Sequence, residues 1–363
     1  MTRENNAYLN QTITYEYDKG GNLTKKTVYP YTTGSLSGVT ATSTKMYSYG
    51  NSSWTDLLTS YDGQAITYDG IGNPLSYLGY TITWNGRQLS TLKGNGVTAS
   101  YKYDADGLRS YKKVGNVEST YQYLGGKLVY EKRGDIELQY GYNSYGDLTL
   151  LRYTEADGTV NYYYAVCNSR GDVEGIYNGA GELRAHYTYD SWGNVISITD
   201  QNGKEITSST HIGILNPIRY RGYYYDAETG MYYVGSRYYN PEVGRWLNTD
   251  NQLSTGDMTG MNLFAYCGNN PVNRIDPTGE AWYHWAIGVG IVAGLAVATV
   301  ISAGSFAFAM TAVGFAAGGI SVGGVTGGLA MATIGSSYAL GAMGFVAAFN
   351  SNSVSDFNAQ GNW

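Results

Sequence analysis

Polar and apolar residues alternate along most of the first two hundred positions of the chain. Residues two apart in a strand share a face, so a Tyr-x-Tyr pair places both rings on one side of a sheet. The Asp, Gly and Asn that follow such pairs are typical of tight turns, because Asp binds its own backbone and Gly and Asn tolerate positive φ. The Leu or Val after the turn begins the return strand. Clear copies of this Tyr-x-Tyr-Asp-x-x-Gly-Asn-Leu unit begin at Tyr15 and Tyr187, and a copy with a single Tyr begins at Tyr68. Weaker copies, such as the one at Tyr101, lie between them.

These units predict a repeated β-hairpin. Between Asp69 and Ala165 they recur about every twenty residues, which is enough for two strands of roughly six residues and two connections. A single hairpin is marginal in water, so neighbouring hairpins must pair edge to edge. We therefore expect residues 1–200 to be mainly β, as a spiralling antiparallel sheet of stacked hairpins. With about ten units, we expect an open, curved wall with unpaired edges.

Composition agrees with a β scaffold, since the 363 residues include 38 Tyr and 50 Gly but only 6 Pro. Tyr favours strands and Gly favours turns. The tyrosines have two interpretations. Packing uses their large contact area and leaves the polar tip hydrated, whereas exposed aromatic rows would bind glycans. Packing is the simpler interpretation, and binding of a cell-surface glycan is the alternative.

The net charge and the rare residue types indicate which partners, metals and cofactors to expect. The formal net charge is -6, and no basic patch is available to neutralise phosphates, so we expect no nucleic-acid partner. Cys167 and Cys267 lie 100 residues apart and are expected to be free thiols. The three histidines are scattered and no phosphate-binding Gly motif occurs, so we expect neither a metal nor a cofactor. The polar first residues lack the apolar core of a secretory signal.

The stretch from Arg219 to Gly279 is dense in ordered landmarks. They are Arg221-Gly222-Tyr223, Asp226-x-x-Thr229-Gly230, Tyr232-Tyr233, Arg237-Tyr238-Tyr239, Gly244-Arg245-Trp246, Asp250, Asn262 to Tyr266, Asn270-Pro271 and Asp276 to Gly279. This stretch closely resembles the RHS repeat-associated core domain, and the Tyr-Asp units resemble the YD repeats of bacterial RHS proteins, wall-associated proteins and teneurins. Together the resemblances cover roughly three quarters of the chain.

The resemblance implies a hollow β-shell, of which 1–200 would be a partial wall and 201–280 the core that plugs it. It further implies a structural role in competition between bacteria, in which the shell encases and releases a C-terminal effector segment. An immunity protein would then be a further partner. Because such shells usually carry more repeats, we expect a piece of a longer polymorphic toxin, secreted or at the cell surface. The alternatives are a glycan-binding adhesion module and an enzyme limited to self-processing.

The resemblance also implies self-cleavage just after the core by an aspartyl-protease-like pair. Two adjacent carboxylates can share one proton and thus supply an acid and a base at one pH. Carried over by position, the catalytic pair is Asp250 and Asp276, with Asp257 as a fallback partner. The motif Asp276 to Gly279 is intact, but the first motif is degraded to Asp-Asn-Gln-Leu, and Glu280 replaces the family's Leu. We expect one cleavage, after Glu280; alternatively, both aspartates only stabilise turns.

The final region, 281–363, has a different composition. From Ala281 to Ser355 it contains no Asp, Glu, Lys or Arg. Its first apolar run exceeds the roughly twenty residues that a membrane-spanning helix needs, and the spacing Gly290–Gly294 permits close helix contact in lipid. We expect an apolar α-helical hairpin, with its second helix from about Leu329 to Phe349. This hairpin would either insert into a membrane or pack inside the shell.

Overall fold

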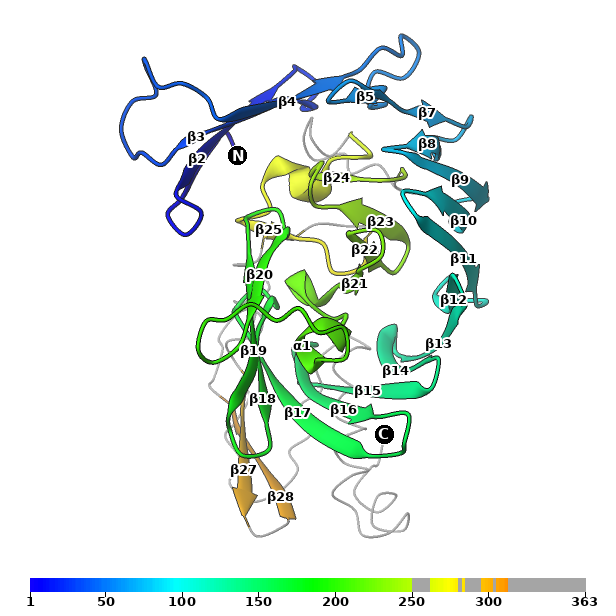
Figure 1. Cartoon of the computed structure of the whole chain (residues 1–363), viewed down its shortest axis with the longest axis vertical. Coiled ribbons are helices and arrows are strands. Elements are labelled where there is room, and N and C mark those ends of the chain that lie inside the picture. The colour runs from blue at the N-terminus through cyan, green and yellow to red at the C-terminus, as the bar shows by residue number, and fades with distance from the viewer. Residues whose placement is uncertain (250–261, 280–282, 285–294, 303–304, 313–363) are drawn as a thin grey trace, which may run out of the picture. The chain divides into compact units, whose positions relative to one another are not determined.

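The computed structural model describes residues 1–249, 262–279, 283–284, 295–302 and 305–312. The chain divides into two compact units, Met1–Trp285 and Ala286–Trp363. The first unit is almost entirely β (Figure 1), which confirms the expected mainly β class.

The wall of the first unit consists of twenty strands in two sheets. Each strand pairs with the next along the chain, in a sheet of six strands (β1 to β6) and a sheet of fourteen (β7 to β20), and the pairs are antiparallel. The repeated hairpins are therefore stacked as the sequence predicts. The strands are β1 (Arg3–Asn6), β2 (Gln11–Tyr17), β3 (Leu23–Pro30), β4 (Ser43–Ser48), β5 (Ser60–Tyr61), β6 (Gln64–Ala65), β7 (Thr67–Tyr68), β8 (Pro74–Tyr77), β9 (Tyr80–Asn85), β10 (Gln88–Gly94), β11 (Val97–Tyr103), β12 (Arg109–Val114), β13 (Val117–Leu124), β14 (Lys127–Arg133), β15 (Ile136–Tyr142), β16 (Leu148–Thr154), β17 (Val160–Cys167), β18 (Val173–Asn178), β19 (Leu183–Tyr189) and β20 (Val195–Thr199).

One repeat shows how the unit folds. Tyr101 and Tyr103 both face the core segment, where Tyr101 packs edge-on against Tyr238 with ring centroids 6.0 Å apart. The Tyr103 hydroxyl lies 3.1 Å from that of Tyr238. The turn that follows is built by Asp104, whose carboxylate accepts two backbone N–H groups at 2.9 and 3.0 Å. Gly107 then adopts a φ of 80°, which favours glycine.

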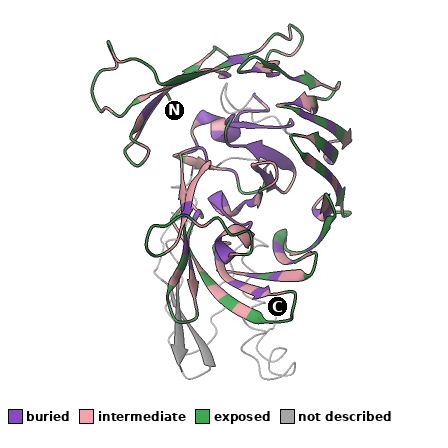
Figure 2. Cartoon of the chain, in the orientation of Figure 1, coloured by how far each residue is buried: buried purple, intermediate pink, exposed green. Residues whose placement is uncertain are grey.

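The core segment, 201–280, packs against wall strands distant in sequence. Its four-stranded sheet has the order β21-β22-β23-β24, and every residue of β22 and β23 is buried. In Figure 2 the buried residues concentrate in this sheet and on the wall strands that face it. The elements of the core segment are α1 (Ile212–Leu215), η1 (Tyr220–Gly222), β21 (Tyr224–Asp226), β22 (Met231–Val234), β23 (Arg237–Asn240), β24 (Arg245–Trp246), η3 (Tyr266–Asn269) and β25 (Arg274–Ile275). β25 pairs with β26 (Tyr283–His284), which follows the core segment.

The two ends of the wall approach each other without joining their sheets. β1 and β20 are outermost strands of different sheets, which agrees with the expected open wall. Side chains nevertheless bridge this gap. The Tyr8 hydroxyl lies 3.1 Å from the Ser197 hydroxyl, and the rings of Tyr15 and Trp192 are 5.6 Å apart.

Packing accounts for most of the wall tyrosines, since they are buried or partly buried in the hydrophobic core that the wall shares with the core segment. β17 is different, because Tyr162 and Tyr164 are 52% and 41% exposed. Val160 and Val166, two residues further along in each direction, are also exposed. The expectation that exposed tyrosines bind glycans therefore concerns this outer row, and it stays a prediction.

The expected helical hairpin differs from the structure where the structure describes it. β27 (Leu295–Ser302) and β28 (Ser305–Ala312) form an antiparallel hairpin. Between 305 and 310, large apolar residues alternate with Ala or Ser, and 295–302 contains β-branched residues, a pattern that favours strands. The expected second helix, 329–349, lies outside the described residues. Among the described residues, no helix has the length and apolar character needed to span a membrane.

Candidate functional site: the junction after the core segment

The predicted catalytic residues are only partly described. Asp276 lies in the turn Asp276–Gly279, which we call the junction, whereas Asp250, Asp257 and Glu280 lie outside the described residues. Asp276 is 2% exposed. Its Oδ1 accepts the Gly279 N–H at 2.9 Å, and its backbone carbonyl accepts the Tyr223 hydroxyl at 2.6 Å. The turn role that the sequence offered for Asp276 is thus present.

Arg237 joins the junction to the core segment. Its Nη2 lies 3.3 Å from Asp276 Oδ2, and its Nε donates to the Gly279 carbonyl. The guanidinium also lies 4.0 Å from the centre of the Trp246 ring. Sequence reasoning treated Arg237 only as a landmark. Its role depends on a contact with a residue 39 positions away in the chain. A local sequence pattern does not predict such a contact.

Two further contacts fix the backbone at the end of the junction. The Ser236 hydroxyl donates to the Gly279 carbonyl at 3.2 Å. Gly279 has a φ of 81°, and a Cβ there would lie 2.4 Å from the Val234 carbonyl. Only glycine fits this position without strain. The Gly279 carbonyl thus has two donors, Arg237 and Ser236, next to a buried carboxylate, a geometry that can polarise a peptide bond.

A buried cluster of charges connects the wall to the core segment. Arg109 on β12 is fully buried and binds Asp226 on β21 through two hydrogen bonds of 2.6 and 3.0 Å. Lys112 binds the same carboxylate at 2.7 Å and Glu228 at 2.8 Å. We call these four residues the Arg109 cluster. Burial alone raises the pKa of Asp226, but the charges of Arg109 and Lys112 and their hydrogen bonds outweigh burial and hold this pKa below its usual value.

Tyrosine rings enclose the Arg109 guanidinium. Five ring centres lie between 4.4 and 6.0 Å from it, so cation–π attraction adds to the ion pair in a site from which water is excluded. The rings come from both the wall and the core segment: Tyr101, Tyr121, Tyr224, Tyr233 and Tyr238. Sequence analysis did not single out Arg109, because its partner is 117 residues away.

Turns of the repeats also dock on the core segment. Asn22 is 1% exposed, and its Oδ1 accepts from Arg245 Nη1 at 3.2 Å and from Asn262 Nδ2 at 2.6 Å. At the last repeat, Asn194 Nδ2 donates to the Pro241 carbonyl at 3.0 Å. The Asn of the repeat unit therefore serves the turn and the contact with the core segment together.

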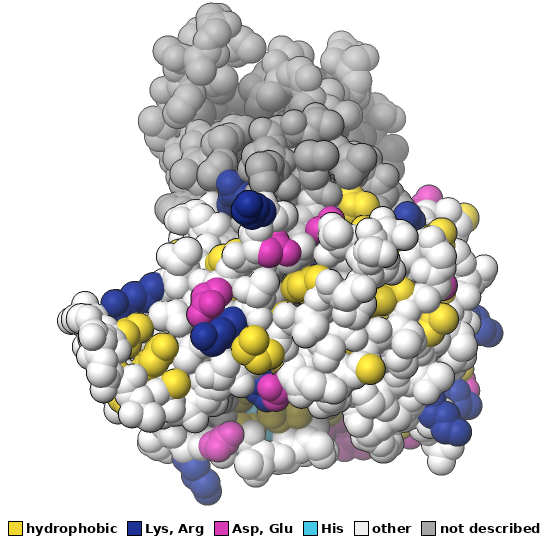
Figure 3. All heavy atoms as spheres, turned by 90° about the horizontal axis from the view of Figure 1, so that it is seen from above, with side chains coloured by type: hydrophobic (Ala, Val, Ile, Leu, Met, Phe, Trp, Pro, Cys, Tyr) yellow, Lys and Arg dark blue, Asp and Glu magenta, His cyan; other side chains and the backbone are white. Residues whose placement is uncertain are grey.

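Charged side chains are spread over the face of the molecule that Figure 3 shows. On the face shown in Figure 3, acidic, basic and hydrophobic side chains are interspersed. Within the described part of the chain, no cluster of His, Cys, Asp and Glu fits a metal ion. Cys167 and Cys267 are free thiols, as predicted.

The sequence profile of the teneurin YD-shell matches residues 1–272. The chain belongs to this family. The matched range covers the wall and most of the core segment and ends before the junction. The Arg109 cluster thus lies within the YD-shell, where it connects wall and core.

Relatives of the chain include bacterial toxins. The tRNA3(Ser)-specific nuclease WapA of Bacillus spizizenii is 36% identical over 289 residues, which are 77% of this chain and 11% of that protein. Toxin subunit YenC1 of Yersinia entomophaga is 26% identical over 77% of this chain and 30% of its own length. The chain therefore spans only a minor part of the relatives it matches.

A solved structure agrees on the fold. The crystal structure titled TcdB2-TccC3-Cdc42 matches 74% of this chain and 13% of its own, with a TM-score of 0.54 and 23% identity. At this identity the likeness concerns the fold alone. It supports the curved YD-shell wall described above.

Proposed function

We propose that this chain forms part of the wall, together with the core, of an RHS-type toxin shell that encases and presents a C-terminal effector segment. The observation that carries the proposal is the Arg109 cluster, which ties the core segment to the wall through buried charges. A core segment that is fixed in this way can hold the segment that follows it in a fixed position. The names of the relatives, a tRNA nuclease and a toxin subunit, agree with a role in a toxin.

The junction supplies the second support. Arg237, Ser236 and Tyr223 each hold a backbone carbonyl of the junction, directly before the region without charged residues. A chain leaving the core segment at Gly279 therefore starts from a fixed point. Uncharged apolar residues avoid water, so a protein interior would shelter them.

We place the protein outside the producing cell, secreted or at the cell surface, because competition between bacteria requires contact with the target. The effector segment and an immunity protein that protects the producer are the partners that follow from this role.

Protection from protease tests the encasing role. The full chain is digested briefly with thermolysin, and the fragments are identified by mass spectrometry. We expect residues 281–363 to resist cleavage in the wild type and to be cut at least about tenfold faster in Arg109→Met, which loosens the wall from the core segment. Lys113→Gln, which breaks only an exposed ion pair with Glu118, is the matched control. Rapid cleavage of 281–363 in the intact wild type would contradict encasing.

We also propose that the junction cleaves itself once, because a buried carboxylate, Asp276, lies beside a peptide carbonyl that has two donors. In this proposal Asp276 and Asp250 share a proton. The ionised carboxylate takes a proton from a water molecule, which attacks the Glu280 carbonyl, one residue beyond the Gly279 carbonyl that Arg237 and Ser236 hold. The protonated carboxyl gives its proton to the Ala281 nitrogen as the Glu280–Ala281 bond breaks. Intact mass spectrometry tests it. Wild type should yield a fragment ending at Glu280, and Asp276→Asn should stay whole. A wild type that remains intact after long incubation would end this second proposal and leave the encasing role untouched.

A further inference from the structure

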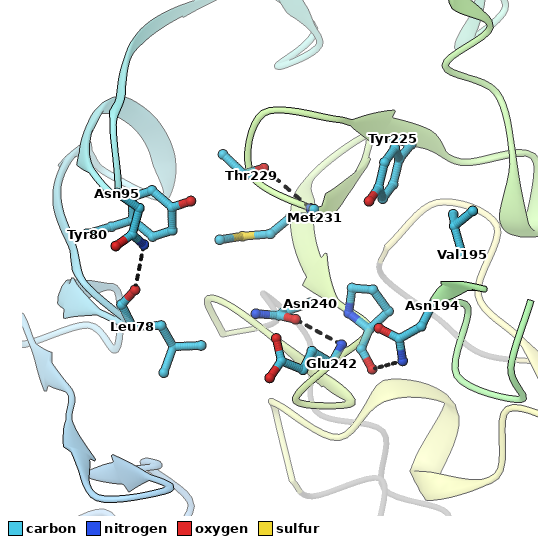
Figure 4. A pocket seen from close by; sticks show the side chains of 12 residues that line it. Leu78, Tyr80, Asn95, Asn194, Val195, Tyr225, Thr229, Met231, Asn240 and Glu242 are labelled. Carbon is cyan, nitrogen blue, oxygen red and sulfur yellow. Dashed lines mark hydrogen bonds between the residues drawn. The ribbon is translucent and has the colours of Figure 1, made fainter. Parts of the chain in front are cut away.

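A cavity of about 320 Å³ lies between the wall and the core segment. Three parts of the chain that are far apart in sequence line it, as Figure 4 shows. Tyr80 and Tyr225 approach the space from opposite sides, with Met231 between them. The volume is within the range of small-molecule sites in proteins, roughly 300–1,000 Å³.

Two phenol hydroxyls in this cavity have no protein partner. Within the described residues, neither the Tyr80 nor the Tyr225 hydroxyl makes a hydrogen bond, although Tyr80 is only 9% exposed. Neighbouring tyrosines do have partners, since Tyr77 binds Asn240 and Tyr61 binds Glu242. Tyr225 is half-buried, and neither hydroxyl is among the buried polar atoms without a partner. Both hydroxyls are therefore open to solvent and available to a bound molecule.

Glu242 adds a carboxylate to the cavity. Its Oε1 accepts from Tyr61 at 3.3 Å. The residue is exposed, so its Oε2 is open to solvent and can accept a hydrogen bond from a ligand at the mouth of the cavity. The side-chain amides of Asn194 and Asn240, which also line the cavity, bind to the protein itself. Asn194 donates to the Pro241 carbonyl at 3.0 Å, and Asn240 Oδ1 accepts the Glu242 N–H at 3.0 Å. These bonds fix the cavity lining, so the free groups are already in position before a ligand arrives.

The residues that line the cavity determine which class of ligand fits. Among the described residues, no Lys, Arg or His lines the cavity, so a phosphate or carboxylate would face Glu242 without a counter-charge. Sugar hydroxyls can donate to the carboxylate and exchange hydrogen bonds with both phenols, while their C–H faces pack on the rings and on Met231. A lone ammonium group would satisfy Glu242 but leave most of the volume empty. We propose that this cavity binds a neutral saccharide of one or two units.

Binding is measured on the full chain by ligand-detected NMR and titration calorimetry. The probes are N-acetylglucosamine and its β-1,4-linked dimer, with glucose 6-phosphate as the anionic probe and lysine as the cationic probe. We expect at least one of the two sugars to bind, and glucose 6-phosphate to bind at least about tenfold more weakly. Lysine binding in the absence of sugar binding would overturn the proposal, as would the failure of both sugars at millimolar concentration.

Variants assign the binding to this cavity. Tyr225→Phe keeps the ring and removes one hydroxyl, and it should weaken sugar binding by roughly threefold to tenfold. Glu242→Gln should weaken it by about tenfold or more, because hydrogen bonds to charged groups are stronger. Glu118→Gln, an exposed carboxylate outside the cavity, should bind sugar as the wild type does. Unchanged sugar binding in both Tyr225→Phe and Glu242→Gln, with unchanged melting temperatures, would place the sugar elsewhere and refute the assignment.

Discussion

Replacing Asp226 by Asn is the sharpest test of how the wall holds the core segment. The substitution preserves shape but removes the negative charge between two buried cations. Arg109 is 0% and Lys112 8% exposed at the side chain, and both bind Asp226 within 3.0 Å. Removing one partner of a buried ion pair costs about 3–5 kcal/mol, because the remaining charge stays buried without compensation.

This cost is large for a folded protein. Net stabilities are on the order of 5–15 kcal/mol, and 1 kcal/mol lowers the melting temperature of a domain of 150–250 residues by about 2–4 °C. We therefore expect Asp226→Asn to melt on the order of 10 °C below the wild type. Differential scanning calorimetry and urea denaturation measure this change. Lys113→Gln is the control, because its ion pair with Glu118 is exposed and should matter little.

A double-mutant cycle separates the ion pair from packing. Arg109→Leu combined with Asp226→Leu removes both charges, and replacing a whole buried ion pair by apolar residues is often close to neutral. The double variant should lose less stability than the sum of the two single variants, by more than about 1 kcal/mol of coupling. The reasoning fails if Asp226→Asn changes the melting temperature no more than Lys113→Gln does, or if the two single effects simply add.

Three further predictions follow from individual contacts. The pKa of Asp226 is held below its usual value of about 3.9, so its stabilisation is complete above that pH and is lost as pH falls through the lower folded-state pKa. Acid titration of the melting temperature should show a larger loss in wild type than in Asp226→Asn, in which Glu131, whose pKa is also lowered, still titrates. Gly279→Ala should cost about 1–3 kcal/mol more than Gly158→Ala in urea denaturation, because both glycines have positive φ but a Cβ at Gly158 meets nothing within 4 Å. Asn22→Ala should cost about 1–3 kcal/mol in the same assay, because it removes the oxygen that accepts from Arg245 Nη1 and Asn262 Nδ2. A change within ±0.3 kcal/mol would contradict the docking of this turn.

Local sequence carries most of the information about the wall. The pairing of Tyr101 with Tyr103 and the turn of Asp104 and Gly107 depend on residues that are close together in the chain, so alternation and turn chemistry reveal them. The shift of register between Lys102 and Tyr103 was not predicted. Such a β-bulge inserts one residue into a strand, and alternation alone does not fix where it occurs.

Contacts between the wall and the core segment could not be predicted in this way. Arg109 looks like an ordinary strand residue after a turn, and Asp226 like a landmark without a partner. Their pairing depends on how the wall curves, because 117 residues separate them. The same holds for Arg237 and Asp276 at the junction. The resemblance to RHS proteins pointed to Asp276 but gave no sign that Arg237 would bind its carboxylate.

In the region after the junction, the length of the apolar run predicted helices where the structure describes strands. A long uncharged run suggested helices, whereas 295–302 and 305–312 form paired strands. The alternation of Phe306, Phe308 and Met310 with Ala was visible in the sequence, but the membrane-span criterion gives it no weight. Alternation should be tested before length when an apolar run is rich in Ala and Gly.

The claim that the wall and the core segment form one interlocked unit is tested most directly by native-state hydrogen exchange, followed by mass spectrometry. If the Arg109 cluster holds them together, amides of β21 to β24 and of β11 to β14 should open with the same free energy and respond equally to urea. Exchange of β21 to β24 at a distinctly lower free energy, while β11 to β14 stay protected, would contradict the account.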